Sequence, residues 1–86
     1  MLFMIIWDTA PEKMMETIKA AKEGKFAPPA GIKTVTEYGT PSGLFWQIVE
    51  ASDQEAVYKY VVPLLYLHRK VDVFPAITPE KFAALF

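Results

Sequence analysis

The first strand that the sequence predicts is apolar on both of its faces, and this feature constrains the fold more than any other. Residues 2–7 read Leu-Phe-Met-Ile-Ile-Trp, and the run ends at Asp8. Six residues is a typical strand length, and a run without polar alternation is typical of a central strand that is covered on both sides. The chain therefore needs something to cover each face of its sheet.

A helix start signal follows this strand directly. Thr9 as N-cap and Glu12 three residues later make a capping box, and Pro11 suits the first helical turn. Gly24 is a plausible end for this helix because glycine readily takes the left-handed conformation there. The paired prolines at 28 and 29 then predict a stiff loop.

A β-hairpin is predicted next, with strands over residues 32–39 and 44–51 joined by a turn at Thr40-Pro41-Ser42-Gly43. If Pro41 and Ser42 are the two loop residues, the register follows. The expected cross-strand partners are then Glu37 with Trp46, Val35 with Ile48 and Lys33 with Glu50. A loop of different length would change these partners.

The second helix signal begins at Ser52, which with Glu55 makes another capping box, and Asp53 suits the first turn. Helical spacing places one set of side chains on a common face: Val57, Val61, Leu64, Leu65 and His68. Pro63 must kink or break this helix because its ring clashes with the preceding turn.

A short last strand at residues 71–74 ends at Pro75, and Thr78 caps a final helix toward Phe86. The element order is thus β-α-β-β-α-β with a short C-terminal helix, in one domain spanning residues 1–86. This split βαβ order predicts a ferredoxin-like α+β sandwich, with both helices on the same face of an antiparallel sheet.

Such a topology leaves one sheet face bare, yet neither face of the first strand is polar. Of the 86 residues, 52% are hydrophobic, which is high for a chain too small to bury more than about 60–65% of its surface alone. We therefore expect a two-fold homodimer with the sheets face to face, forming a dimeric α+β barrel. The alternative is that the aromatic residues only fill a small core at extra density.

Composition excludes several classes of function. The formal net charge is −1, so no basic field for nucleic acid or an anionic membrane is predicted. The densest basic stretch, His68-Arg69-Lys70, fits the C-terminus of a helix. With no cysteine and one histidine, no metal site or cofactor is expected, and neither a leader nor a membrane span is recognisable. A cytoplasmic location is the default expectation.

Four residues are the candidates for a site. His68, the only histidine, titrates near neutral pH and is the candidate catalytic base; otherwise it satisfies the last carbonyls of its helix. Trp7, Tyr38 and Trp46 are the candidates for ligand binding, although most such rings bury their bodies and leave a polar tip in water.

Several structural motifs carry a family resemblance over nearly the whole chain. They are the opening apolar strand, Pro28-Pro29-Ala30-Gly31 before the second strand, the run from Gly43 to Asp53 followed by a helix, and the strand end at Pro75. Together they resemble a small prokaryotic family of domains of unknown function, which is similar to the dimeric α+β barrel superfamily. The resemblance implies a ferredoxin-like protomer and a sheet-to-sheet homodimer.

That superfamily includes cofactor-free monooxygenases, haem-degrading enzymes, muconolactone-isomerase-like proteins and effector-binding domains. This chain has no second histidine to match the enzymes, so the sequence leaves open whether it is an enzyme. Three hypotheses stand: a dimer that binds a small apolar or aromatic molecule between helices and sheet, a cofactor-free monooxygenase or isomerase with His68 as base, and an accessory domain that serves only in interaction.

Overall fold

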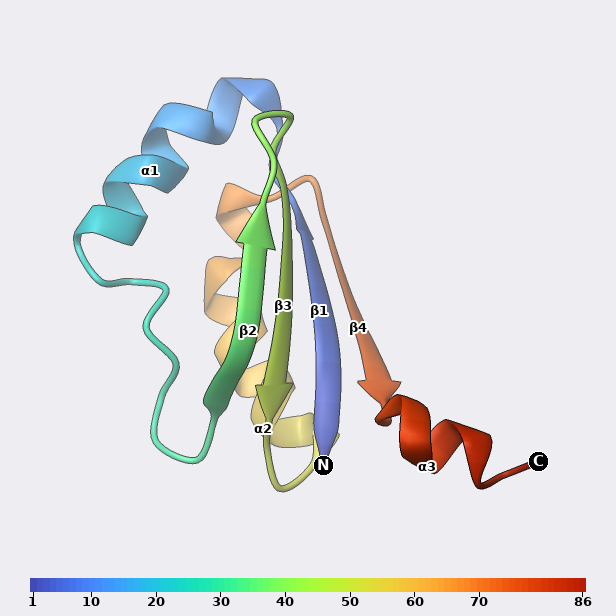
Figure 1. Ribbon diagram of the computed structural model, residues 1–86. Coiled ribbons are helices and arrows are strands. Elements are labelled where there is room, and N and C mark those ends of the chain that lie inside the picture. Colours follow the sequence, from blue (N-terminus) through green and yellow to red (C-terminus); the bar gives the residue numbers. More distant parts are fainter.

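A computed structural model describes residues 1–86 as four strands and three α-helices (Figure 1). The strands are β1 (Leu2–Asp8), β2 (Lys33–Gly39), β3 (Leu44–Glu50) and β4 (Lys70–Ala76). The helices are α1 (Met14–Lys22), α2 (Gln54–Val61) and α3 (Pro79–Ala83), with 3₁₀ turns η1 (Pro11–Lys13) and η2 (Val62–Leu67). The sheet order is β2-β3-β1-β4, and every neighbouring pair is antiparallel. This is the predicted ferredoxin-like α+β fold.

Strand β1 occupies a central position and has two apolar faces, as its sequence predicts. Phe3, Ile5 and Trp7 are buried on the side of the sheet where α1 and α2 lie (Figure 1). Their alternates on β1 are only half-buried. The helices therefore cover one face alone, and the core lies between them and the sheet.

The other sheet face is covered by no helix, and apolar side chains make up most of its centre. Pairing places Met4 beside Ile48 and Phe74, and Ile6 beside Trp46. Paired residues point to the same side of a sheet, so these side chains form one surface. We call it the uncovered face; its apolar side chains include Met4, Ile6, Tyr38, Trp46, Ile48 and Phe74, and Thr36 and Asp72 also lie on it.

The predicted hairpin register is wrong near the turn and right beyond it. Glu37 pairs with Gln47 instead of Trp46, and Lys33 pairs with Glu50 as expected. β2 ends at Gly39 and β3 begins at Leu44 as expected, but Gly39 pairs with Phe45 instead of Leu44, and a bulge at Val35 restores the register. Because a one-residue shift exchanges the faces of a strand, the shift decides that Gln47 pairs with Glu37 on the helix side.

Both predicted capping boxes need correction. The first helix begins with η1, and Thr9 is buried with its hydroxyl oxygen unpaired in place of capping. In α2 the cap is Asp53 instead of Ser52: its carboxylate accepts a hydrogen bond from the Ala56 N–H at 2.9 Å. The predicted helix end at Gly24 is confirmed by its φ of 78°.

The break expected at Pro63 is present. Helix α2 ends at Val61, and the chain continues as η2. A 3₁₀ helix has three residues per turn, so Leu64 and Leu67 are buried while Leu65 is exposed. This change of period places His68 just after the last turn.

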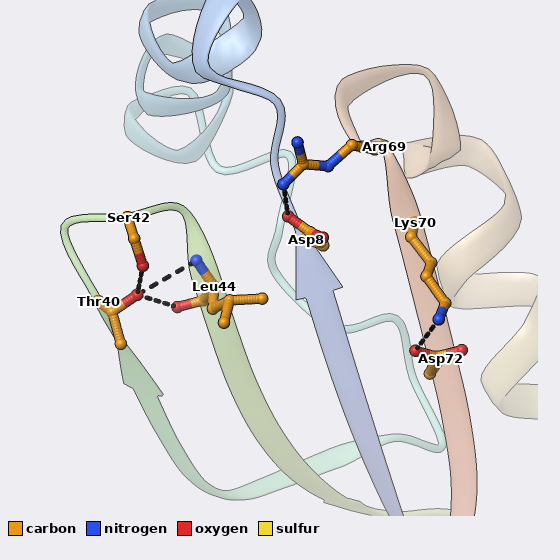
Figure 2. Close-up of polar contacts among 7 residues, drawn as sticks. All are labelled: Asp8, Thr40, Ser42, Leu44, Arg69, Lys70 and Asp72. Atoms are coloured by element: carbon orange, nitrogen blue, oxygen red, sulfur yellow. Dashed lines mark hydrogen bonds and ion pairs between the residues drawn. The ribbon is translucent and has the colours of Figure 1, made fainter.

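An ion pair joins the end of β1 to the start of β4, between the Asp8 carboxylate and Arg69. The two side chains meet at 2.8 Å where β1 ends and β4 is about to begin (Figure 2). Lys70 and Asp72 pair at 3.5 Å along β4. Figure 2 also shows the hairpin turn, where the Thr40 hydroxyl contacts Ser42 and the backbone of Leu44.

Helix α3 lies away from the other helices, beyond the end of β4 (Figure 1). Thr78 caps it as predicted, since its hydroxyl accepts a hydrogen bond from the Lys81 N–H at 3.2 Å. None of its residues is buried, and Phe82, Leu85 and Phe86 are exposed. The chain therefore carries a second apolar surface outside its core.

Candidate functional site

A cavity of about 350 Å³ lies against the helix side of the sheet. We call it the helix–sheet cavity. Residues from β1, α1, α2, the hairpin and two connecting segments line it: Trp7, Thr17, Ala21, Phe26, Glu37, Tyr38, Gly39, Phe45, Trp46, Gln47, Tyr60 and His68. Its volume is at the lower end of the range for small-molecule sites, which are likewise mostly apolar with a few placed polar groups.

A buried hydrogen-bond chain fixes one wall of this cavity. The Trp7 indole N–H donates to Gln47 Oε1 at 3.0 Å, and Gln47 Nε2 donates to Thr34 Oγ1 at 3.0 Å. Gln47 Nε2 also reaches the Tyr60 hydroxyl at 3.4 Å, and that hydroxyl donates to the Phe26 carbonyl at 2.7 Å. Satisfied networks of this kind hold buried side chains in one arrangement.

Aromatic rings pack edge to face around Trp7. Its ring centroid lies 5.9 Å from that of Phe26 and 5.7 Å from that of Tyr60, both in T-shaped geometry. The imidazole of His68 completes the group, 4.9 Å from Trp7 and 5.8 Å from Phe26. Four elements thus contribute rings to one cluster, which forms the deep part of the cavity wall.

The surroundings of His68 favour its neutral form. Burial lowers the pKa of His68 below its ordinary value, although the bond to the Leu64 carbonyl and the charge of Asp8 oppose that shift. Nδ1 lies 2.7 Å from the Leu64 carbonyl oxygen, which can only accept, so Nδ1 carries the proton. In the neutral ring Nε2 is then a bare acceptor, and it is buried without a protein partner.

Tyr60 also has a shifted pKa. Burial raises the pKa of the Tyr60 phenol, the Gln47 hydrogen bond lowers it, and the Glu37 charge raises it. The phenol therefore stays protonated near neutral pH and acts as the donor to Phe26. Neither Tyr60 nor His68 carries a charge at the cavity wall under these conditions.

The four predicted site residues separate into two pairs. Trp7 and His68 lie in contact in the deep wall. Tyr38 and Trp46 border the same cavity, but they pair with each other on the uncovered face, so their side chains point mainly to the other side of the sheet. The hairpin ends of β2 and β3 therefore border both the cavity and the uncovered face.

Three important wall residues were not predicted from the sequence: Phe26, Gln47 and Tyr60. Gln47 had a signal, because it is the one polar residue between apolar neighbours in the Leu44–Val49 run. Phe26 had none, because it lies in the loop after α1 and reaches the cavity only through tertiary packing.

The structure contains no group of three or more His, Cys, Asp or Glu side chains that could hold a metal ion. It also contains no helix with the length and apolar character needed to cross a membrane.

Fold and cavity together define a ferredoxin-like α+β protein with an aromatic helix–sheet cavity. The fold resembles that of a solved structure described as an antibiotic biosynthesis monooxygenase, with a TM-score of 0.52 and 20% sequence identity. That match covers 91% of this chain and 100% of the other. At this identity the likeness shows the fold alone.

The chain belongs to a family defined as a domain of unknown function (DUF3303), whose model matches residues 1–86. A search of curated proteins found none that matches it.

Proposed function

We propose that this protein is a homodimer that binds a small aromatic or apolar molecule in the helix–sheet cavity. The observation that carries the proposal is the wall itself: a preformed space of about 350 Å³ bounded by the rings of Trp7, Phe26 and Tyr60 and held by the Gln47 hydrogen bonds. Preformed apolar pockets with few polar groups are the usual sites for such ligands.

Ligand binding is tested by thermal shift across a panel of small aromatic compounds. Binding to the folded state raises the melting temperature, and the rise grows with the logarithm of the ligand excess. Ala21→Phe is the matched variant, since Ala21 lines the cavity from an exposed position on α1 and a larger side chain there fills the space. Stabilisation of the wild type by a compound that leaves Ala21→Phe unchanged supports the proposal; no response from any compound contradicts it.

The uncovered face supports the homodimer. Apolar side chains from all four strands lie together on it, namely Met4, Ile6, Tyr38, Trp46, Ile48 and Phe74, and exposed apolar patches mark sites of protein association. The exposed Phe82, Leu85 and Phe86 on and after α3 add to the surface that a second copy can bury. A chain without cysteine suits the reducing cytoplasm, where we place the dimer.

The homodimer is tested by sedimentation velocity at micromolar concentration. Phe74→Lys places a charge on the uncovered face, where Phe74 is exposed, and we expect it to convert the dimer to monomer. Met15→Lys on α1, also at an exposed apolar position, is the control and should leave the dimer intact. A monomeric wild type would contradict the homodimer.

A second candidate function is a cofactor-free monooxygenase or isomerase with His68 as the base. It is favoured by the bare Nε2 of a neutral His68 and by the name of the structural neighbour. Rings around Nε2 must move before a substrate reaches it, because the atom is closed off from solvent. Oxygen uptake with electron-rich phenols tests it: turnover that persists in His68→Gln would exclude this role.

A further inference from the structure

The residues that line the helix–sheet cavity carry a negative charge and no positive one. Among its lining residues Glu37 is the only one with an ionised side chain, since burial keeps His68 neutral. No lysine or arginine lines it. The space is thus bounded by aromatic rings and one carboxylate.

Neighbouring charges do not reverse this balance. Lys13 pairs with Glu16 and Lys25 with Glu23, each at 3.5 Å and at exposed positions. Arg69 is committed to Asp8 at 2.8 Å. Lys22, next to Ala21 on α1, has no ion-pair partner, but it is exposed and does not line the cavity; Glu37, which does line it, has no ion-pair partner either.

The rings add to the effect of Glu37. The face of an aromatic ring carries negative charge density and attracts a cation within about 6 Å of the centroid. The Trp7 centroid lies 5.9 Å from that of Phe26 and 5.7 Å from that of Tyr60, so the three rings stand together in one wall. Grouped aromatic rings recognise organic ammonium groups in proteins. Glu37 in the same lining adds a negative charge, which an aromatic carboxylate would meet as a like charge.

We propose that the helix–sheet cavity prefers a small organic cation, an ammonium group attached to an aromatic or alkyl body, over a neutral or anionic molecule of the same size. The ammonium group lies toward Glu37 at the exposed edge, and the apolar body lies against the rings of Trp7, Phe26 and Tyr60. This preference rests on the proposed ligand-binding function and adds a charge selectivity to it.

Three probes with the same phenyl ring test the preference near neutral pH: benzylamine as cation, benzyl alcohol as neutral molecule and benzoate as anion. Binding is followed by the indole N–H resonance of Trp7 in ¹⁵N-labelled protein. We expect benzylamine to bind roughly 3- to 10-fold more tightly than benzyl alcohol, and benzoate to bind most weakly.

Glu37→Gln is the decisive variant, and Glu50→Gln, at an exposed position on β3 away from the cavity lining, is its control. Glu37→Gln should remove most of the benzylamine advantage and leave benzyl alcohol unchanged, whereas Glu50→Gln should alter neither.

If benzyl alcohol binds as tightly as benzylamine, or if Glu37→Gln weakens both equally, the charge preference is overturned while ligand binding stands. If none of the three probes shifts the Trp7 resonance, both proposals fail.

Discussion

Gln47 is the single side chain on which the most cavity contacts depend. It accepts from Trp7, donates to Thr34 and reaches Tyr60, and it is buried among apolar residues. A buried polar group is stable only while its partners are present. The residue that holds the aromatic wall in place is therefore also the one most sensitive to replacement.

Gln47→Leu should lower the free energy of unfolding by about 1–3 kcal/mol, because the Trp7 indole N–H loses its acceptor in a buried position. Urea denaturation measures the change. Gln54→Leu, on the exposed start of α2, is the control and should cost less than about 0.5 kcal/mol. Equal costs for the two variants would mean that the buried bond contributes nothing specific.

His68 should make stability depend on pH. Its pKa is lowered in the folded state, so the unfolded chain binds the proton more readily, and stability contributed by neutral His68 is present above the ordinary value of 6.5 and lost as pH falls below it. Between about pH 7.5 and about pH 5.5, the wild type should lose more unfolding free energy than His68→Gln. The same loss in both proteins would show that His68 is not the responsible group.

Two glycines differ in how much room their surroundings leave for a side chain. Gly43 and Gly24 both have positive φ, 99° and 78°, but a Cβ at Gly43 would lie 2.7 Å from the Thr9 carbonyl oxygen, while one at Gly24 meets nothing within 4 Å. Gly24→Ala should cost about 1–2 kcal/mol from backbone strain alone.

Gly43→Ala should cost clearly more than Gly24→Ala, because the clash with the backbone of Thr9 adds to the strain. It should also weaken the bond from the Thr9 N–H to the Gly43 carbonyl, which is 2.9 Å long. Thermal unfolding of the two variants compares them directly. Similar melting temperatures would show that the hairpin turn can move away from Thr9 at little cost.

Element order was predictable from the sequence because strand length, proline positions and helix caps are local signals. Register was not: whether Glu37 pairs with Trp46 or Gln47 depends on one residue in the turn and on the bulge at Val35. Sequence patterns cannot fix such a shift, since both registers leave apolar residues on each face. The same shift determines which residues of β2 lie on the cavity side, because pairing with β1 fixes the orientation of β3.

The candidate site was predictable only in part, for the same reason. Trp7 and His68 were found as an aromatic residue at a strand end and a lone histidine after a helix. The 4.9 Å distance between their ring centroids depends on where η2 ends after Pro63. The position of Phe26 depends on how the loop between α1 and β2 packs against the core. These are tertiary contacts with no local pattern.

At the scale of the molecule, the fold is more elongated than its length requires. The Cα radius of gyration is 13.6 Å, above the roughly 12 Å of a compact chain of this size, because α3 extends beyond the sheet (Figure 1). The molecule has two different sides. Helices and sheet enclose the cavity on one side, and no helix covers the sheet on the other.

The two tryptophans report on these two sides separately. Trp7 lies in the cavity wall with its indole N–H on Gln47, and Trp46 pairs with Ile6 and Tyr38 on the uncovered face. In a ¹⁵N-labelled sample each gives one indole N–H resonance, so one spectrum observes both sides of the sheet.

Titration of this sample with a small aromatic amine is the most direct test of the cavity as a ligand site. We predict that the Trp7 resonance shifts and saturates with added ligand, that the shift disappears in Ala21→Phe, and that the Trp46 resonance responds to protein concentration through dimerisation. A Trp7 resonance that stays fixed across cationic, neutral and anionic aromatic ligands would contradict the proposed function.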